Sequence, residues 1–173
     1  MMHPATTPFL AVRELAQRLN DNDGDYDALL EMAHDREFVL LGEATHGTQD
    51  FYRMRAQITR RLIVEGGFDA VAIEGDWPDT WRVNCFVQGE GDAEAALADF
   101  KRFPTWMWRN REMRDFILWL REHNASLSPE ARVGVYGLDL YSMYQSADAV
   151  IRYLERVDPE QAAMARDRYA ALD

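Results

Sequence analysis

The stretch Gly42-Glu-Ala-Thr-His-Gly-Thr48 contains the side chains best suited to chemistry. It follows the apolar run at residues 38–41 and carries Glu43 and His46 in a short turn bounded by glycines. A carboxylate beside an imidazole can orient the ring and assist proton transfer, and the same two groups can ligate a metal ion. The spacing therefore predicts a proton-transfer pair or part of a metal site, placed where a buried strand ends.

Two further carboxylates follow apolar runs in the same way. Glu74 ends the run at 69–74, and Asp139 follows the run at 132–138. Ligands of open parallel sheets bind outside the carboxyl ends of the strands, so neighbouring strands would bring these acids and His46 to one rim. Like charges held close raise at least one pKa unless a cation compensates. The cluster therefore predicts an acid–base set, a divalent-metal site or both. The alternative is that each acid only caps the helix that follows it, and this alternative is stronger for Asp139 than for the glutamates.

Arg55 and several tryptophans accompany the acids. Arg55 lies on the helix that follows the His46 turn, where it would pair with Glu43 or Glu74, bind an oxyanion, or belong to a solvated basic face. Four of the tryptophan side chains would wall an apolar substrate pocket or simply pack in the core: Trp77, Trp81, Trp106 and Trp108.

The elements that must position these residues alternate between short apolar runs and amphipathic stretches. Helical periodicity predicts helices at 9–19, 26–34, 49–65, 79–87, 93–100, 110–123, 142–156 and from 159 onward, and the apolar runs predict strands at 38–41, 69–74 and 132–138. Strands separated by helices indicate an α/β fold, a parallel β-sheet with helices on its faces. Three strands are few for such a sheet, and the last helix has no stop signal, so we expect the sheet to be incomplete in this chain.

Composition narrows the partners. The 173 residues carry 30 acidic and 19 basic side chains, a net charge of −11, which argues against nucleic acid and against an anionic membrane surface as partners.

The single cysteine allows no intramolecular disulfide and no cysteine-based zinc site. No signal peptide or membrane-spanning run is apparent, so a cytoplasmic location is expected. The absence of P-loop, G-x-G-x-x-G and G-x-S-x-G motifs disfavours nucleotide binding and a serine α/β-hydrolase mechanism.

Three motifs together resemble the erythromycin esterase family: the His46 turn, Ile73-Glu-Gly-Asp-Trp77, and Tyr136-Gly-Leu-Asp-Leu-Tyr-Ser142. The resemblance runs from about residue 38 to residue 158 and includes the aromatic segment at 104–109. It implies an α/β fold and hydrolysis of a macrolide lactone-type ester, and so a link to macrolide resistance.

The resemblance also implies a role for each candidate residue. His46 matches the general base that activates water, and Glu43 matches the acid beside it. Glu74 would tune the cluster or ligate a metal, and Arg55 would hold substrate or the second-strand carboxylate. Asp139, Trp77 and Trp106 are the candidates for contact with a small-molecule ester. The cofactor is either none or one divalent ion, with Glu43, His46 and Glu74 as candidate ligands.

One departure from the family shapes the domain prediction. Family members are longer, and their second half carries a His-Asn-x-His type motif, whereas this chain has no histidine after His123. We therefore expect a helical segment at 1–37, followed at 38–173 by the N-terminal half of the family's α/β domain. A missing C-terminal half or a partner chain would complete the site, unless the chain is a truncated relic.

Two other functions remain open at this stage. One is a binding or assembly module without catalysis, which packs against another chain or domain. The other is a small metal-dependent hydrolase that uses Glu43, His46, Glu74 and Asp139 alone.

Overall fold

The computed structural model of the chain describes residues 8–20 and 22–170, and their contacts divide the chain into two compact units, the first ending at Val39 and the second beginning at Leu40. The first unit contains the helix α1 (Pro8–Leu15), the short 3₁₀ helix η1 (Asp23–Tyr26) and the helix α2 (Asp27–Ala33). None of the residues of α1 is buried. His34 lies at the C-cap of α2, where an imidazolium interacts favourably with the helix dipole.

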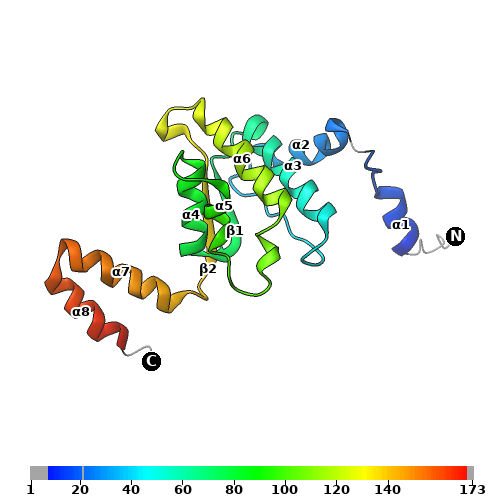
Figure 1. Cartoon of the computed structure of the whole chain (residues 1–173). Coiled ribbons are helices and arrows are strands. Elements are labelled where there is room, and N and C mark those ends of the chain that lie inside the picture. The colour runs from blue at the N-terminus through cyan, green and yellow to red at the C-terminus, as the bar shows by residue number, and fades with distance from the viewer. Residues whose placement is uncertain (1–7, 21, 171–173) are drawn as a thin grey trace. The chain divides into compact units, whose positions relative to one another are not determined.

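The second unit begins its regular structure with a long helix after the His46 turn. Its elements are α3 (Gln49–Gly66), β1 (Ala70–Asp76), α4 (Trp77–Val87), α5 (Ala93–Ala98), η2 (Thr105–Met107), α6 (Arg111–Ala125), η3 (Pro129–Ala131), β2 (Gly134–Asp139), α7 (Met143–Val157) and α8 (Pro159–Tyr169) (Figure 1). Gly67 ends α3 in the left-handed conformation, as the paired glycines predict. The side chain of Asp158 accepts the Gln161 N–H and caps α8.

The two strands form a parallel sheet, and this confirms the predicted α/β class. β1 and β2 pair in parallel from Ala70 opposite Gly134 to Asp76 opposite Asp139, so both carboxyl ends lie at the same edge. At Gly137 an added Cβ would lie 2.4 Å from the carbonyl oxygen of Gly75, which restricts this position to glycine. The close approach lets β2 lie directly beside β1 under the start of α4.

One face of the sheet contributes to the hydrophobic core. Ile73 and Val135 point into a cluster built with side chains of α3, α4, α5 and α6. Alternate residues face the other way, and Leu138 on that side is 67% exposed. Each strand is therefore buried on one face only, because the described helices that share its core lie on that side.

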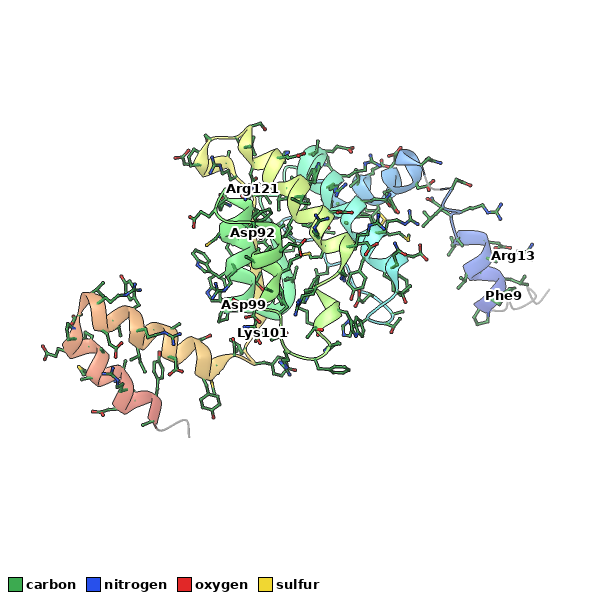
Figure 2. All side chains as sticks on the ribbon, viewed as in Figure 1. Phe9, Arg13, Asp92, Asp99, Lys101 and Arg121 are labelled. Carbon is green, nitrogen blue, oxygen red and sulfur yellow. The ribbon has the colours of Figure 1, made fainter. Side chains whose placement is uncertain are left out.

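Buried side-chain amides join the helices to β2. Asn124 of α6 donates to the carbonyl oxygens of Val87 and Val133 and accepts the Val133 N–H at 2.9 Å, and Asn84 of α4 accepts the Val135 N–H at 3.0 Å. Such groups satisfy backbone atoms that the two-stranded ladder leaves unpaired. Arg121 of α6 extends to the loop before α5 and donates to the Gly91 carbonyl, next to Asp92 (Figure 2).

The predicted strand at 38–41 is absent, and this expectation was wrong. The segment has no regular structure, and Phe38 and Leu40 are 79% and 90% exposed. A four-residue run becomes a buried strand only when neighbours pair with its backbone and cover its side chains. Within residues 8–20 and 22–170, β1 and β2 pair only with each other, so the run lacks that support.

The last two helices, α7 and α8, lie side by side as a helical hairpin (Figure 1). In the described part of the chain, no helix has the length and apolar character needed to span a bilayer.

Candidate functional site

The site is built around the two oxygens of the Glu43 carboxylate. Oε1 lies 2.5 Å from His46 Nδ1, and Oε2 accepts a hydrogen bond of 2.9 Å from Arg55 Nη1. The Glu43 side chain is only 11% exposed, whereas that of His46 is 41% exposed. Because an ionised carboxylate only accepts hydrogen bonds, His46 Nδ1 is assigned as the donor of this contact, which leaves Nε2 of a neutral ring as an acceptor. That tautomer is the one a general base requires.

Arg55 reaches Glu43 from the second turn of α3. Its guanidinium carbon lies 5.1 Å from the centre of the Tyr52 ring and 5.3 Å from that of the Trp108 ring. Of the roles that the sequence left open, the structure shows pairing with Glu43, and the expected pairing of Arg55 with the second-strand carboxylate Glu74 is not seen. The reason is geometric, because Glu43 stands on the turn that leads directly into α3.

The turn itself requires glycine at position 47. Gly47 has φ +84°, and an added Cβ would lie 2.8 Å from the Trp106 ring. The Gly47 N–H also points to the Tyr52 hydroxyl at 3.4 Å. Trp106 therefore packs against the turn that carries His46.

A pocket of about 180 Å³ opens beside His46 at the carboxyl ends of the strands. Glu74 of β1 and Asp139 of β2 line it together with His46, so the predicted convergence on one rim occurs for these three residues. Asp76, Asp79, Arg102, Phe103, Trp108 and Tyr141 also line the pocket. Glu43 and Arg55 lie behind His46 rather than among the lining residues.

The acids at this edge interact electrostatically. Burial raises the pKa of the Asp139 carboxyl, the charges of Glu74 and Asp76 raise it further, and Arg102 opposes them. The pKa of Asp79 is likewise raised, first by burial and then by Asp76 and Asp99. The rim can therefore retain a carboxyl proton at a higher pH than an isolated aspartate would.

Asp76 has a role that sequence reasoning missed. It precedes α4 but makes no side-chain cap bond to that helix. Its Oδ1 instead accepts the Ser142 N–H at 2.9 Å and ties the end of β1 to the segment that follows β2. The spacing of a carboxylate before a helix suggests a cap, and no local signal distinguishes this long-range bond from one.

The aromatic candidates separate into different places. Trp77 stacks on Trp81 and Tyr136 and lines a larger open groove between α4 and α7, which shares Asp76, Asp79, Arg102 and Tyr141 with the His46 pocket. Trp108 lines the His46 pocket, and its Nε1 donates to the Glu74 carbonyl oxygen at 2.7 Å. Sequence reasoning placed Trp108 among several pocket candidates but could not identify this bond.

Arg102 and Tyr141 form a second feature missed from the sequence. The guanidinium carbon of Arg102 lies 3.4 Å from the centre of the Tyr141 ring, and both residues line the pocket. Tyr141 belongs to the third motif, which was a usable signal, whereas Arg102 lies in an irregular connector without one.

The candidate ligands do not fit a divalent ion in this arrangement. Both Glu43 oxygens and His46 Nδ1 are occupied by each other or by Arg55. Among residues 8–20 and 22–170, no three His, Cys, Asp or Glu side chains are grouped as a metal site requires. A guanidinium on the same carboxylate supplies the positive charge that a metal would otherwise bring.

Comparison with known proteins adds to this geometry. The family model for erythromycin esterase matches residues 63–173, a range that includes Glu74 and Asp139 and begins after Glu43, His46 and Arg55. The chain is 26% identical over 121 residues to erythromycin esterase type II of Escherichia coli, which covers 70% of this chain and 27% of the relative. It is 25% identical over 146 residues to the putative hydrolase YbfO of Bacillus subtilis, covering 84% and 31%.

Two solved structures share the fold. A succinoglycan biosynthesis protein superposes with a TM-score of 0.68 at 26% identity, covering 88% of this chain and 38% of that one. A Bacillus cereus protein superposes with a TM-score of 0.66 at 24% identity, covering 88% and 36%. The chain thus spans about a third of the length of each of these proteins.

Proposed function

Because the chain belongs to the erythromycin esterase family, we propose that it carries the water-activating part of a carboxylic ester hydrolase. The observation that carries the proposal is the contact of 2.5 Å between Glu43 Oε1 and His46 Nδ1 beside the pocket. A named esterase and a named hydrolase among the relatives support the same reaction class.

In the proposed reaction, His46 removes a proton from water while the water oxygen attacks the ester carbonyl carbon. Glu43 stabilises the imidazolium that forms, and Arg55 holds the Glu43 carboxylate in place. The tetrahedral intermediate then loses the alkoxide, which takes up the proton that His46 removed from the water and leaves as an alcohol. Asp139 and Glu74 line the space where the substrate would lie.

The proposed substrate is a macrolide lactone-type ester, in keeping with the name of the Escherichia coli relative. The side chains of Phe103, Trp108 and Tyr141 give the pocket apolar walls. Trp77 lines the adjoining larger groove, and its contact with substrate stays a prediction, as does that of Trp106. Macrolide resistance and a cytoplasmic location stay predictions that depend on this assignment.

The proposal is tested with His46→Ala and His46→Gln in the polypeptide of natural length. General-base catalysis contributes about 10²- to 10⁴-fold, so both variants should lose at least about 100-fold in ester hydrolysis. Their melting curves should match that of the parent, since His46 is largely exposed. Normal turnover by either variant would refute the base assignment.

A chelator serves as the control for metal chemistry. The donor set around Glu43 does not fit a divalent ion, so hydrolysis should be unchanged after dialysis against a chelator. Loss of hydrolysis with recovery on adding a divalent ion would favour the metal-dependent alternative.

A binding or assembly module is the second candidate, and exposed apolar side chains favour it. Leu138 and Leu140, which flank Asp139, are both exposed, and so is Met143 at the start of α7. Contiguous exposed apolar surface often marks a site of association. Light scattering of the 173-residue chain tests the binding or assembly module. A chain that stays monomeric at all concentrations would count against it.

A further inference from the structure

The guanidinium of Arg55 is held by aromatic rings as well as by a charge. Its carbon lies 5.1 Å from the ring centre of Tyr52 and 5.3 Å from that of Trp108, and the two rings meet edge to face at 6.5 Å. Cations within about 6 Å of an aromatic ring centre are attracted by the ring quadrupole. Arg55 thus has two aromatic neighbours in addition to its bond to Glu43.

Each ring is itself fixed to a different part of the site. Trp108 is buried, and its Nε1 donates to the Glu74 carbonyl oxygen at 2.7 Å, which joins it to the end of β1. Tyr52 is buried on α3, and its hydroxyl lies 3.4 Å from the Gly47 nitrogen in the His46 turn. The two rings therefore link the end of β1, the helix α3 and the turn.

We propose that Tyr52 and Trp108 are positioning residues, which hold Arg55 where its Nη1 meets Glu43 Oε2 and so fix the orientation of the His46 ring. Both rings act on His46 through Arg55 and Glu43. The catalytic consequence rests on the proposed hydrolase function, but the effect on the His46 ring does not.

The geometry explains why an ion pair alone would not be sufficient. Glu43 must present one oxygen to Arg55 and the other to His46 at the same time, which fixes the plane of the carboxylate. A guanidinium that is free to rotate would bond Glu43 in several arrangements, and some of them would take the oxygen that His46 requires. Two rings packed against the guanidinium limit those arrangements. The planar guanidinium of arginine stacks on aromatic faces, whereas the compact ammonium of lysine does not.

The test compares Tyr52→Leu, which removes one ring, with the matched control Tyr52→Phe, which retains it. Nitrogen NMR of the 173-residue chain measures the chemical shifts of the two ring nitrogens of His46. These signals are assigned as the ones that disappear in the His46→Gln variant. The Phe variant should keep the parent's shifts, with the proton on Nδ1. The Leu variant should move both shifts toward those of an imidazole that exchanges between tautomers. Identical shifts in the Leu and Phe variants would overturn the proposal.

Hydrolysis by the natural-length polypeptide supplies the second readout. The Leu variant should lose about 10-fold in kcat relative to the Phe variant, with KM changed by less than about 2-fold, because an imprecisely held base affects the reaction more than binding. An equal kcat in the two variants would count against the proposal. If the parent shows no hydrolysis but the shifts differ as expected, the hydrolase function fails and the positioning role stands.

Loss of the Tyr52 ring from a buried position carries a risk of unfolding, which circular dichroism detects. In that case Arg55→Lys decides, since it keeps the charge beside Glu43 but lacks the planar group. We expect the Lys variant to show the disturbed His46 shifts. Retention of the parent's shifts would mean that charge alone orders the site, and the proposal would be rejected.

Discussion

At the scale of single residues, the site depends on how the two oxygens of Glu43 are shared. One oxygen faces a base and the other faces a cation, so Glu43 connects His46 to the helix α3. The pocket on the other side of His46 is lined by carboxylates that are close enough to affect one another. We expect their mutual repulsion to have a measurable effect on stability.

Asp139 provides a prediction about pH. Burial, followed by Glu74 and Asp76, raises the pKa of its carboxyl in the folded chain. The folded chain then binds the proton more tightly than the unfolded chain, so this group's contribution to stability is complete below the unfolded pKa and is lost as pH rises through the folded pKa. The Asp139→Asn variant has an uncharged side chain at this position at every pH, so it does not lose this contribution as pH rises. The substitution should therefore raise Tm more at pH 7 than at pH 3.

The exposed Asp148 on α7 supplies the control for this prediction. Asp148→Asn should change Tm by a similar small amount at both pH values. A Tm difference for Asp139→Asn that does not vary with pH would contradict the argument.

At the scale of elements, β2 is held in place by side chains of helices as well as by β1. Asn84 of α4 and Asn124 of α6 both bond to backbone atoms of residues 133 and 135. The Asp76–Ser142 bond then fixes the segment that leaves β2. These bonds hold Asp139 at the edge where the pocket lies.

Asn124→Leu tests this element-scale role. The variant leaves the Val133 N–H and the Val87 carbonyl without the partners that they have in the parent, in a buried place. Each such buried group costs about 1–3 kcal/mol, so we expect a loss of about 3 kcal/mol in the free energy of unfolding, measured by urea denaturation.

The matched control is Glu122→Leu on the exposed face of the same helix. Surface substitutions usually stay within about 0.5 kcal/mol, and this one should do so. Similar losses in the two variants would mean that the amide bonds contribute little.

At the scale of the whole molecule, the chain divides into two compact units, the first ending at Val39 and the second beginning at Leu40. The connecting segment has exposed apolar residues and no regular structure, and proteases cleave such segments readily. We therefore expect chymotrypsin at low concentration to cut first near Phe38 or Leu40. Mass spectrometry of the early products should show a fragment that begins near residue 40 and still contains Glu43 and His46.

Protection of this segment would refute the division. A first cut within α3 or α6, for example, would mean that the core described for the second unit is less stable than the connection. The prediction of a helical segment at 1–37, followed at 38–173 by the N-terminal half of the family's α/β domain, is a different statement, and it stays a prediction.

The sequence by itself determined the local elements and the edge at which the acids lie. Apolar periodicity located α3, α4 and α6, and the runs that end at Glu74 and Asp139 became the parallel strands β1 and β2. Such features depend on side chains a few residues apart, and a parallel sheet necessarily brings the ends of its strands to one edge.

Only the tertiary structure decided which groups bond to one another. Arg55 bonds to Glu43 rather than Glu74, Asp76 bonds to Ser142, and the run at 38–41 remains outside the sheet. Each outcome depends on which residues the packing of helices against the sheet brings within about 3 Å, and a hydrogen bond is lost when they are an ångström further apart. Spacing along the chain contains no information at that precision.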